Sequence, residues 1–71
     1  MTPVLPKPGR VIRASLRALQ AAGMDDRDAL ATIGDVAGLV MRRLHDSDAG
    51  RQWAFQIQAQ IRTRQAQRED T

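Results

Sequence analysis

The sequence predicts a small all-α domain of three helices, with an extended proline-rich N-terminal arm and a frayed polar C-terminal tail. Apolar residues recur at steps of three and four through the middle of the chain, which is the spacing of one helix face. The 71 residues contain no cysteine, so one small core without a disulfide must hold the fold. We expect the arm over 1–9, helices over about 10–22, 26–45 and 48–66 of a domain that spans 10–68, and the tail over 69–71.

The arm contains all the prolines of the chain, Pro3, Pro6 and Pro8. Each proline fixes its own φ angle and biases the preceding residue toward extended conformations. We therefore expect 1–9 to lie loosely on the domain as a tether. A proline-rich docking ligand is the alternative, although only Pro3 with Pro6 has the required spacing.

The first helix is expected to be amphipathic, with an apolar face formed by Ile12, Leu16 and Leu19. Gly23 should end it in the left-handed conformation, and Met24 should supply the hydrophobic contact that accompanies such an end. Residues 1–23 contain four basic side chains and no acidic one: Lys7, Arg10, Arg13 and Arg17. Positive charge near a helix N-terminus is unfavourable, which suggests an anionic partner, although exposure to solvent explains the same residues.

The second helix has the widest apolar stripe, formed by Leu30, Ile33, Val36, Ala37, Val40, Met41 and Leu44. At about 100° per residue the stripe is about 140° wide, which predicts packing against more than one neighbour. Asp35 and Arg42 lie on the opposite side and should face water. Gly34 and Gly38 each cost about 1 kcal/mol in a helix, so they predict the close approach of another backbone from the first helix, the third helix or a second subunit.

Three aspartates begin this second helix. Asp25 or Asp26 is predicted to cap it, and Asp28 lies in the first turn, where negative charge is favourable. A divalent-metal site is the other interpretation, but capping explains the three residues and the sequence lacks the remaining ligands of a calcium loop. We therefore expect neither a metal nor a cofactor.

The turn at 45–50 contains His, Asp and Ser side by side. Ser47 or Asp46 is expected to cap the third helix, and His45 to end the second. Adjacent polar residues in a turn point in divergent directions, so they do not make a hydrolytic triad. Phosphate-binding loops, zinc-protease motifs and nucleophile elbows are also absent from the sequence, so we expect no catalytic residue and no enzyme.

The segment 52–62 fits two interpretations. Its apolar residues alternate with polar or small ones as in a strand, but Trp53, Ile57 and Ile61 also share one helix face. Good helix formers and the lack of a second strand in the sequence favour a helix, because a strand would have to pair between two chains. Beyond Ile61 the apolar stripe ends, so 63–71 is expected to fray into solvent.

Two large apolar residues, Leu39 and Phe55, fall outside the predicted core faces. Single exposed hydrophobic residues are ordinary, but these two suggest a surface for self-association or for a partner. The leading hypothesis is a small non-catalytic helical protein-interaction module, an adaptor, regulator or inhibitor of a larger protein, that also self-associates. Its expected interface consists of Leu39, Phe55, Trp53, Gly34 and Gly38.

The alternative hypothesis is a small basic nucleic-acid-binding protein, because the basic residues of the first helix have the spacing to follow phosphates. The acidic start of the second helix opposes a helix-turn-helix, whose recognition helix presents its first residues to the groove. We expect no membrane partner and no small-molecule substrate. With no signal peptide and no apolar run of about 20 residues, the chain should be cytoplasmic. Its arginine-rich composition is typical of a GC-rich bacterial, plasmid or phage genome.

Overall fold

The computed structural model describes residues 4–44 and 46–69, which form three helices and no strand. The helices are α1 (Pro8–Ala21), α2 (Asp26–Arg43) and α3 (Asp48–Glu69). The predicted fold class, a small all-α domain of three helices, is therefore confirmed. The segment 52–62 is helical, and within the described ranges no helix is both long and apolar enough to cross a membrane.

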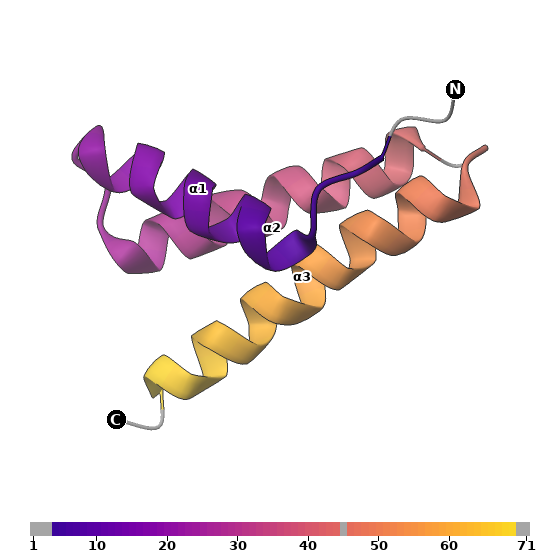
Figure 1. Ribbon diagram of the computed structural model, residues 1–71. Coiled ribbons are helices and arrows are strands. Elements are labelled where there is room, and N and C mark those ends of the chain that lie inside the picture. The colour runs from indigo at the N-terminus through magenta and orange to yellow at the C-terminus, as the bar shows by residue number, and fades with distance from the viewer. Residues whose placement is uncertain (1–3, 45, 70–71) are drawn as a thin grey trace.

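Helices α1 and α2 run antiparallel to each other, and α3 crosses both of them (Figure 1). The largest interface lies between α2 and α3, whereas α1 and α2 have a smaller one. The molecule measures 41 × 24 × 18 Å, and its long dimension follows from the 22 residues of α3. Helix α3 therefore serves as the support on which the other two helices lie.

Side-chain caps begin α2 and α3. Asp25 Oδ1 accepts a hydrogen bond from the Asp28 N–H at 2.8 Å, so Asp25 rather than Asp26 is the cap of α2. Ser47 Oγ accepts a hydrogen bond from the Gly50 N–H at 3.2 Å, directly before α3 begins. Both caps satisfy backbone donors that a helix start leaves without intrahelical partners.

The end of α1 has the predicted geometry. Gly23 has a φ of 98°, and its N–H donates to Gln20 O at 3.0 Å. The Met24 N–H donates to Leu19 O at 3.0 Å, and both of these side chains pack against the core. Together these contacts form a Schellman motif with its hydrophobic contact. His45, which was expected to end α2, lies outside the described residues.

The core is small and entirely apolar over the described residues. Its buried side chains are Ile12, Leu16, Ala29, Leu30, Ile33, Ala37, Ala54, Ile57 and Ile61. The predicted stripe of α2 is therefore confirmed at Leu30, Ile33 and Ala37, whereas its last three members are only half-buried. The prediction that Val36 lies in the core was wrong: this residue is 53% exposed, because it faces the space between α1 and α2.

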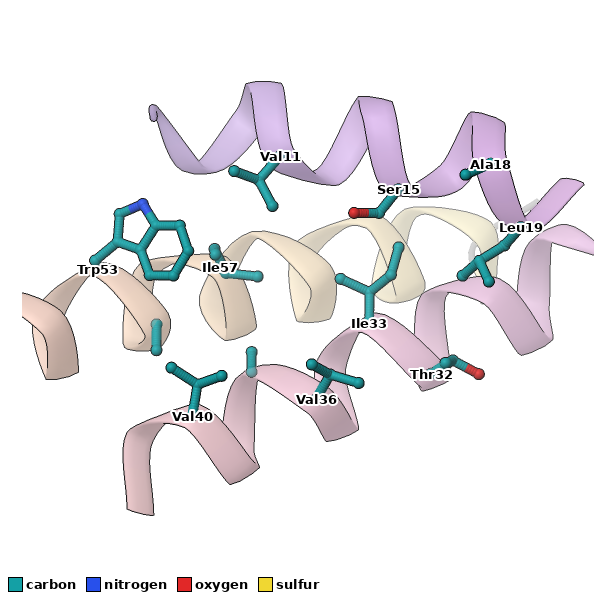
Figure 2. A pocket seen from close by; sticks show the side chains of 12 residues that line it. Val11, Ser15, Ala18, Leu19, Thr32, Ile33, Val36, Val40, Trp53 and Ile57 are labelled. Atoms are coloured by element: carbon teal, nitrogen blue, oxygen red, sulfur yellow. The ribbon is translucent and has the colours of Figure 1, made fainter. Parts of the chain in front are cut away.

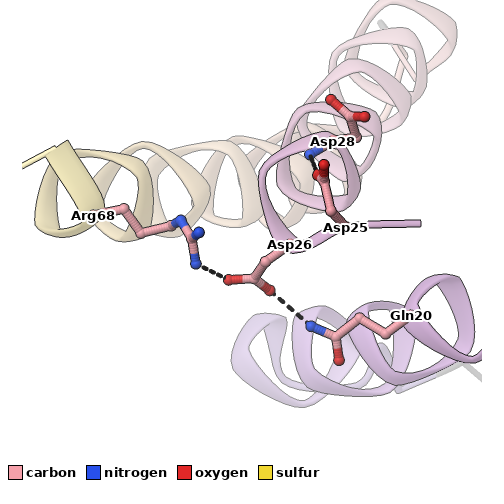
Figure 3. A network of polar contacts seen from close by, with 5 residues as sticks. All are labelled: Gln20, Asp25, Asp26, Asp28 and Arg68. Atoms are coloured by element: carbon pink, nitrogen blue, oxygen red, sulfur yellow. Dashed lines mark hydrogen bonds and ion pairs between the residues drawn. The ribbon is translucent and has the colours of Figure 1, made fainter. Parts of the chain in front are cut away.

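The C-terminal part of α3 differs from the frayed tail that was expected. Residues 63–69 continue the helix, and Arg68 forms an ion pair with Asp26 at the start of α2. The Gln20 amide donates to the other oxygen of the Asp26 carboxylate at 2.8 Å, so this network joins all three helices (Figure 3). An exposed ion pair adds at most about 1 kcal/mol, but it gives the polar end of α3 a fixed contact.

Candidate protein-binding groove

An open apolar groove of about 340 Å³ lies between α1 and α2, with α3 as its floor (Figure 2). No charged residue lines it, and only two of its lining residues are polar, Ser15 and Thr32. The groove forms because α1 and α2 both rest on α3 and share only a small interface with each other. Its fourth side is open, so Val36 is 53% exposed and Val11, Leu19, Val40 and Trp53 are only half-buried, whereas the other large apolar lining residues belong to the core.

The two walls of the groove differ in the size of their side chains. The centre of the α1 wall has the small residues Ser15 and Ala18, between Val11 and Leu19, whereas Val36 and Val40 of α2 are larger. Figure 2 shows both valines pointing toward α1 and Ser15 pointing toward α2. The α1 wall is therefore low at its centre, opposite the two valines.

Trp53 lies at one end of the groove and also holds the N-terminal arm. Its indole is half-buried against the core, and its Nε1–H donates to Pro6 O at 2.6 Å. The arm is thus tied to α3 at Pro6, while Val4 and Leu5 are 94% and 44% exposed. Sequence reasoning placed Trp53 on the core face of α3 but did not predict its contact with the arm.

The structure does not bring Leu39 and Phe55 together, although both are more than half exposed. Phe55 borders a shallow depression with Met41 on the side where α2 meets α3. Leu39 and Met41 are about 160° apart around α2, at about 100° per residue. Leu39 does not line the groove, but it lies about 60° from the lining residue Val36 around α2, which places it on the lip of the groove. The groove side of α2 thus carries Leu39 and Val36, and sequence reasoning missed the second of these.

Gly34 and Gly38 face α3 of the same chain. A Cβ atom on Gly34 would lie 3.4 Å from Ile61 Cγ2, and one on Gly38 would lie 2.9 Å from Gln58 Nε2. Gln58 Nε2 donates to Gly34 O at 3.2 Å. The third helix therefore accounts for the close approach that the glycines predicted, through its side chains rather than its backbone. Neither glycine lines the groove.

The basic residues lie on a different side of α1 from the groove. Lys7, Arg10, Arg13 and Arg17 are exposed, and none has an ion-pair partner among the described residues. Arg10 and Arg17 directly precede the groove residues Val11 and Ala18, so they are about 100° away from them around the helix. The basic face and the groove are therefore separate surfaces that substitutions can test independently.

The three aspartates at the start of α2 diverge. Asp25 caps the helix, Asp26 contacts Gln20 and Arg68, and Asp28 points away from both carboxylates (Figure 3). No group of three or more His, Cys, Asp or Glu residues in the described part of the chain is arranged to hold a metal ion.

The groove and the basic face of α1 thus differ in chemistry. The groove offers uncharged apolar walls, and the basic face offers exposed cations. Comparison of the chain with known protein families, with curated proteins and with solved structures finds no match.

Proposed function

We propose that this chain is a small non-catalytic helical protein-interaction module, an adaptor, regulator or inhibitor of a larger protein, and that it binds protein helices in the groove. The observation that best supports this function is the groove itself, which is open, apolar and free of charged lining residues. Contiguous apolar surface of this kind marks protein interaction sites. A helix laid into the groove would complete the burial of the side chains that α1, α2 and α3 leave uncovered.

The dimensions of the groove suit a short amphipathic helix. The groove residues of α1 lie between 11 and 19, and those of α2 lie between 32 and 40. At 1.5 Å per residue each wall is about 12 Å long, which matches about two turns of a bound helix. Such a helix presents apolar anchors at i, i+3, i+4 and i+7 along one face.

Trp53 gives the groove a contact point of the kind that dominates binding energy, and Leu39 adds exposed apolar surface beside the groove. The half-buried indole of Trp53 offers a large rigid surface at one end. Leu39 is 52% exposed on the lip. Aromatic anchors in partly desolvated pockets contribute most to protein association, whereas peripheral contacts exclude water.

Site-specific photo-crosslinking tests the proposed function. A benzophenone amino acid replaces Leu39 in one variant and Phe55 in the matched control, because both residues are more than half exposed but lie on different surfaces. After irradiation in the cells that produce the protein, we expect covalent adducts to a protein chain from position 39 and few from position 55. Adducts from position 55 alone, or from neither position, would refute the groove as the interaction surface.

Nucleic-acid binding is a second candidate function, supported by the exposed basic side chains of α1 and by the lack of an acidic residue in its first turn. Retention of DNA or RNA on the protein should then be strong at low salt and fall steeply as salt rises. Replacing Arg13 and Arg17 by Glu should abolish it and leave crosslinking from Leu39 unchanged. A parent protein that retains neither nucleic acid at low salt refutes this candidate.

A further inference from the structure

We propose that the occupant of the groove is a second copy of this chain, with Val36 and Leu39 of each α2 seated in the groove of the other copy. These two residues are called the α2 ridge below. The inference rests on the proposed function, because it names the partner that the groove binds. It makes the protein a twofold-symmetric homodimer whose two α2 helices pack antiparallel at the centre.

The groove side of the molecule contains both a projection and a recess, as a symmetric dimer requires. The α2 ridge projects, since its two residues are 53% and 52% exposed. The wall opposite it is low at its centre, where Ser15 and Ala18 lie between the larger Val11 and Leu19. In a twofold dimer each surface patch must complement itself, so a ridge beside a recess of similar chemistry is self-complementary.

The charges on the groove side specify an antiparallel pairing of the two α2 helices. At about 100° per residue, Arg43 lies within about 20° of Val36 around the helix and Asp28 within about 80°. Both side chains are exposed, and neither has an ion-pair partner among the described residues. Their distances along α2 from Val36 are nearly equal, seven residues for Arg43 and eight for Asp28.

An antiparallel pair centred on Val36 therefore places Arg43 of each copy beside Asp28 of the other. A parallel pair would place the two Arg43 side chains together and the two Asp28 side chains together. Like charges in contact suppress a wrong arrangement, and opposite charges fix the register. The lining of the groove carries no charge, and the one like-charge pair that the antiparallel arrangement brings near its centre is Asp35 with Asp35 of the other copy, about 100° from Val36 and therefore turned away from the contact.

Because its core is small, the chain would gain stability by forming a dimer. Three of its buried residues, Ala29, Ala37 and Ala54, are alanines, which bury little apolar area each. Domains of about 70 residues without a disulfide or a metal commonly reach sufficient stability by association. Covering the groove removes from water the apolar side chains that the core does not use.

Charge reversal tests the dimer and its register together. Sedimentation equilibrium should show the parent chain as a dimer, and Asp28→Arg and Arg43→Asp should each weaken it by roughly tenfold to a hundredfold, because each variant loses two opposite-charge contacts and gains two repulsive ones. Mixing the two variants should form a heterodimer that is tighter than either homodimer, since both contacts are then restored. Arg42→Asp is the matched control: it makes the same charge change beside Arg43, but about 120° from Val36 and about 60° from Leu39, so it should weaken the dimer far less than Arg43→Asp does.

Circular dichroism establishes whether each variant folds. If Asp28→Arg fails to fold, comparing the dimer dissociation constants of Arg43→Asp and Arg42→Asp decides the register of the two α2 helices. A parent chain that is monomeric at all concentrations overturns the second copy as the occupant. So does a dimer that responds equally to Arg43→Asp and Arg42→Asp, or a mixture without preferential heterodimers. The crosslinking comparison between positions 39 and 55 is independent of these results: adducts from position 39 to a different protein would overturn the dimer and keep the proposed function.

Discussion

Replacing both residues of the α2 ridge by serine should weaken self-association while leaving the fold intact. Val36 and Leu39 are 53% and 52% exposed, so about half of each side chain is available for burial in a dimer. Full burial of such a side chain contributes about 1.5–3 kcal/mol, and half of that is about 0.8–1.5 kcal/mol per residue. Two residues in each of two copies then contribute about 3–6 kcal/mol, of which the ordering of side chains on association cancels part.

The lower end of that range corresponds to a rise of roughly a hundredfold in the dissociation constant of Val36→Ser/Leu39→Ser, measured by sedimentation equilibrium. Phe55→Ser is the matched control, because it removes a large side chain that is 57% exposed on another surface. It should change the dissociation constant little. Helicity should be the same in both variants. An unchanged dissociation constant for the double variant, or an equal rise for Phe55→Ser, would refute the assignment of the interface to the α2 ridge.

Substitutions inside the domain should lower its free energy of unfolding by amounts that denaturant titration resolves. Ile61→Ala empties a site that is 2% exposed and should cost about 2–5 kcal/mol; a loss below 1 kcal/mol would show that Ile61 is not in the core. Gly23→Ala forces a side chain into a φ of 98° and should cost about 1–2 kcal/mol, so an unchanged midpoint would contradict the Schellman geometry. Asp25→Ala removes the cap of α2 and should cost about 0.5–2 kcal/mol, more than Asp28→Ala does. Trp53→Phe removes the hydrogen bond to Pro6 and should cost about 0.5–1.5 kcal/mol, with faster proteolysis of the arm; equal proteolysis rates would argue against the tether.

Local sequence signals predicted the helices and their ends because the physics of each is contained within a few residues. The apolar spacing around Leu30 and Ile33 identified α2, and both residues are buried. Gly23 and Asp25 mark the end of one helix and the start of the next through backbone conformation and a side-chain cap. Neither signal depends on how the helices pack.

The groove could not be predicted in the same way, because it depends on the relative placement of three helices. Periodicity identifies which face of α2 is apolar but not how much of that face a neighbour covers, so Val36 was placed in the core although it is more than half exposed. The same reason explains why Leu39 and Phe55 were expected on one interface. The contact of Arg68 with Asp26 joins residues distant in the chain, so local composition at 63–71 indicated fraying instead.

One sequence signal pointed toward the groove: the apolar stripe of α2 is wider than α1 and α3 can cover. Val36 lies at the edge of the α2 stripe, and Leu39 lies further out on the same side. Two apolar residues three positions apart at the border of a stripe, followed by Arg43, which has no ion-pair partner among the described residues, are the sequence pattern of the proposed interface. Phe55 has no second large apolar residue three positions away in α3, which fits an isolated exposed hydrophobic residue.

Dilution followed by amide nuclear magnetic resonance tests most directly whether the groove is the surface that a second copy covers. As the protein is diluted from millimolar to low micromolar concentration, the amide signals of Ser15, Ala18, Val36 and Leu39 should shift together, along one concentration dependence. The signals of Met41 and Phe55 should stay constant, because the depression that they border is outside the proposed interface. Shifts that concentrate at Met41 and Phe55, or no shifts at all while the mass stays monomeric, would contradict the dimer formed through the groove.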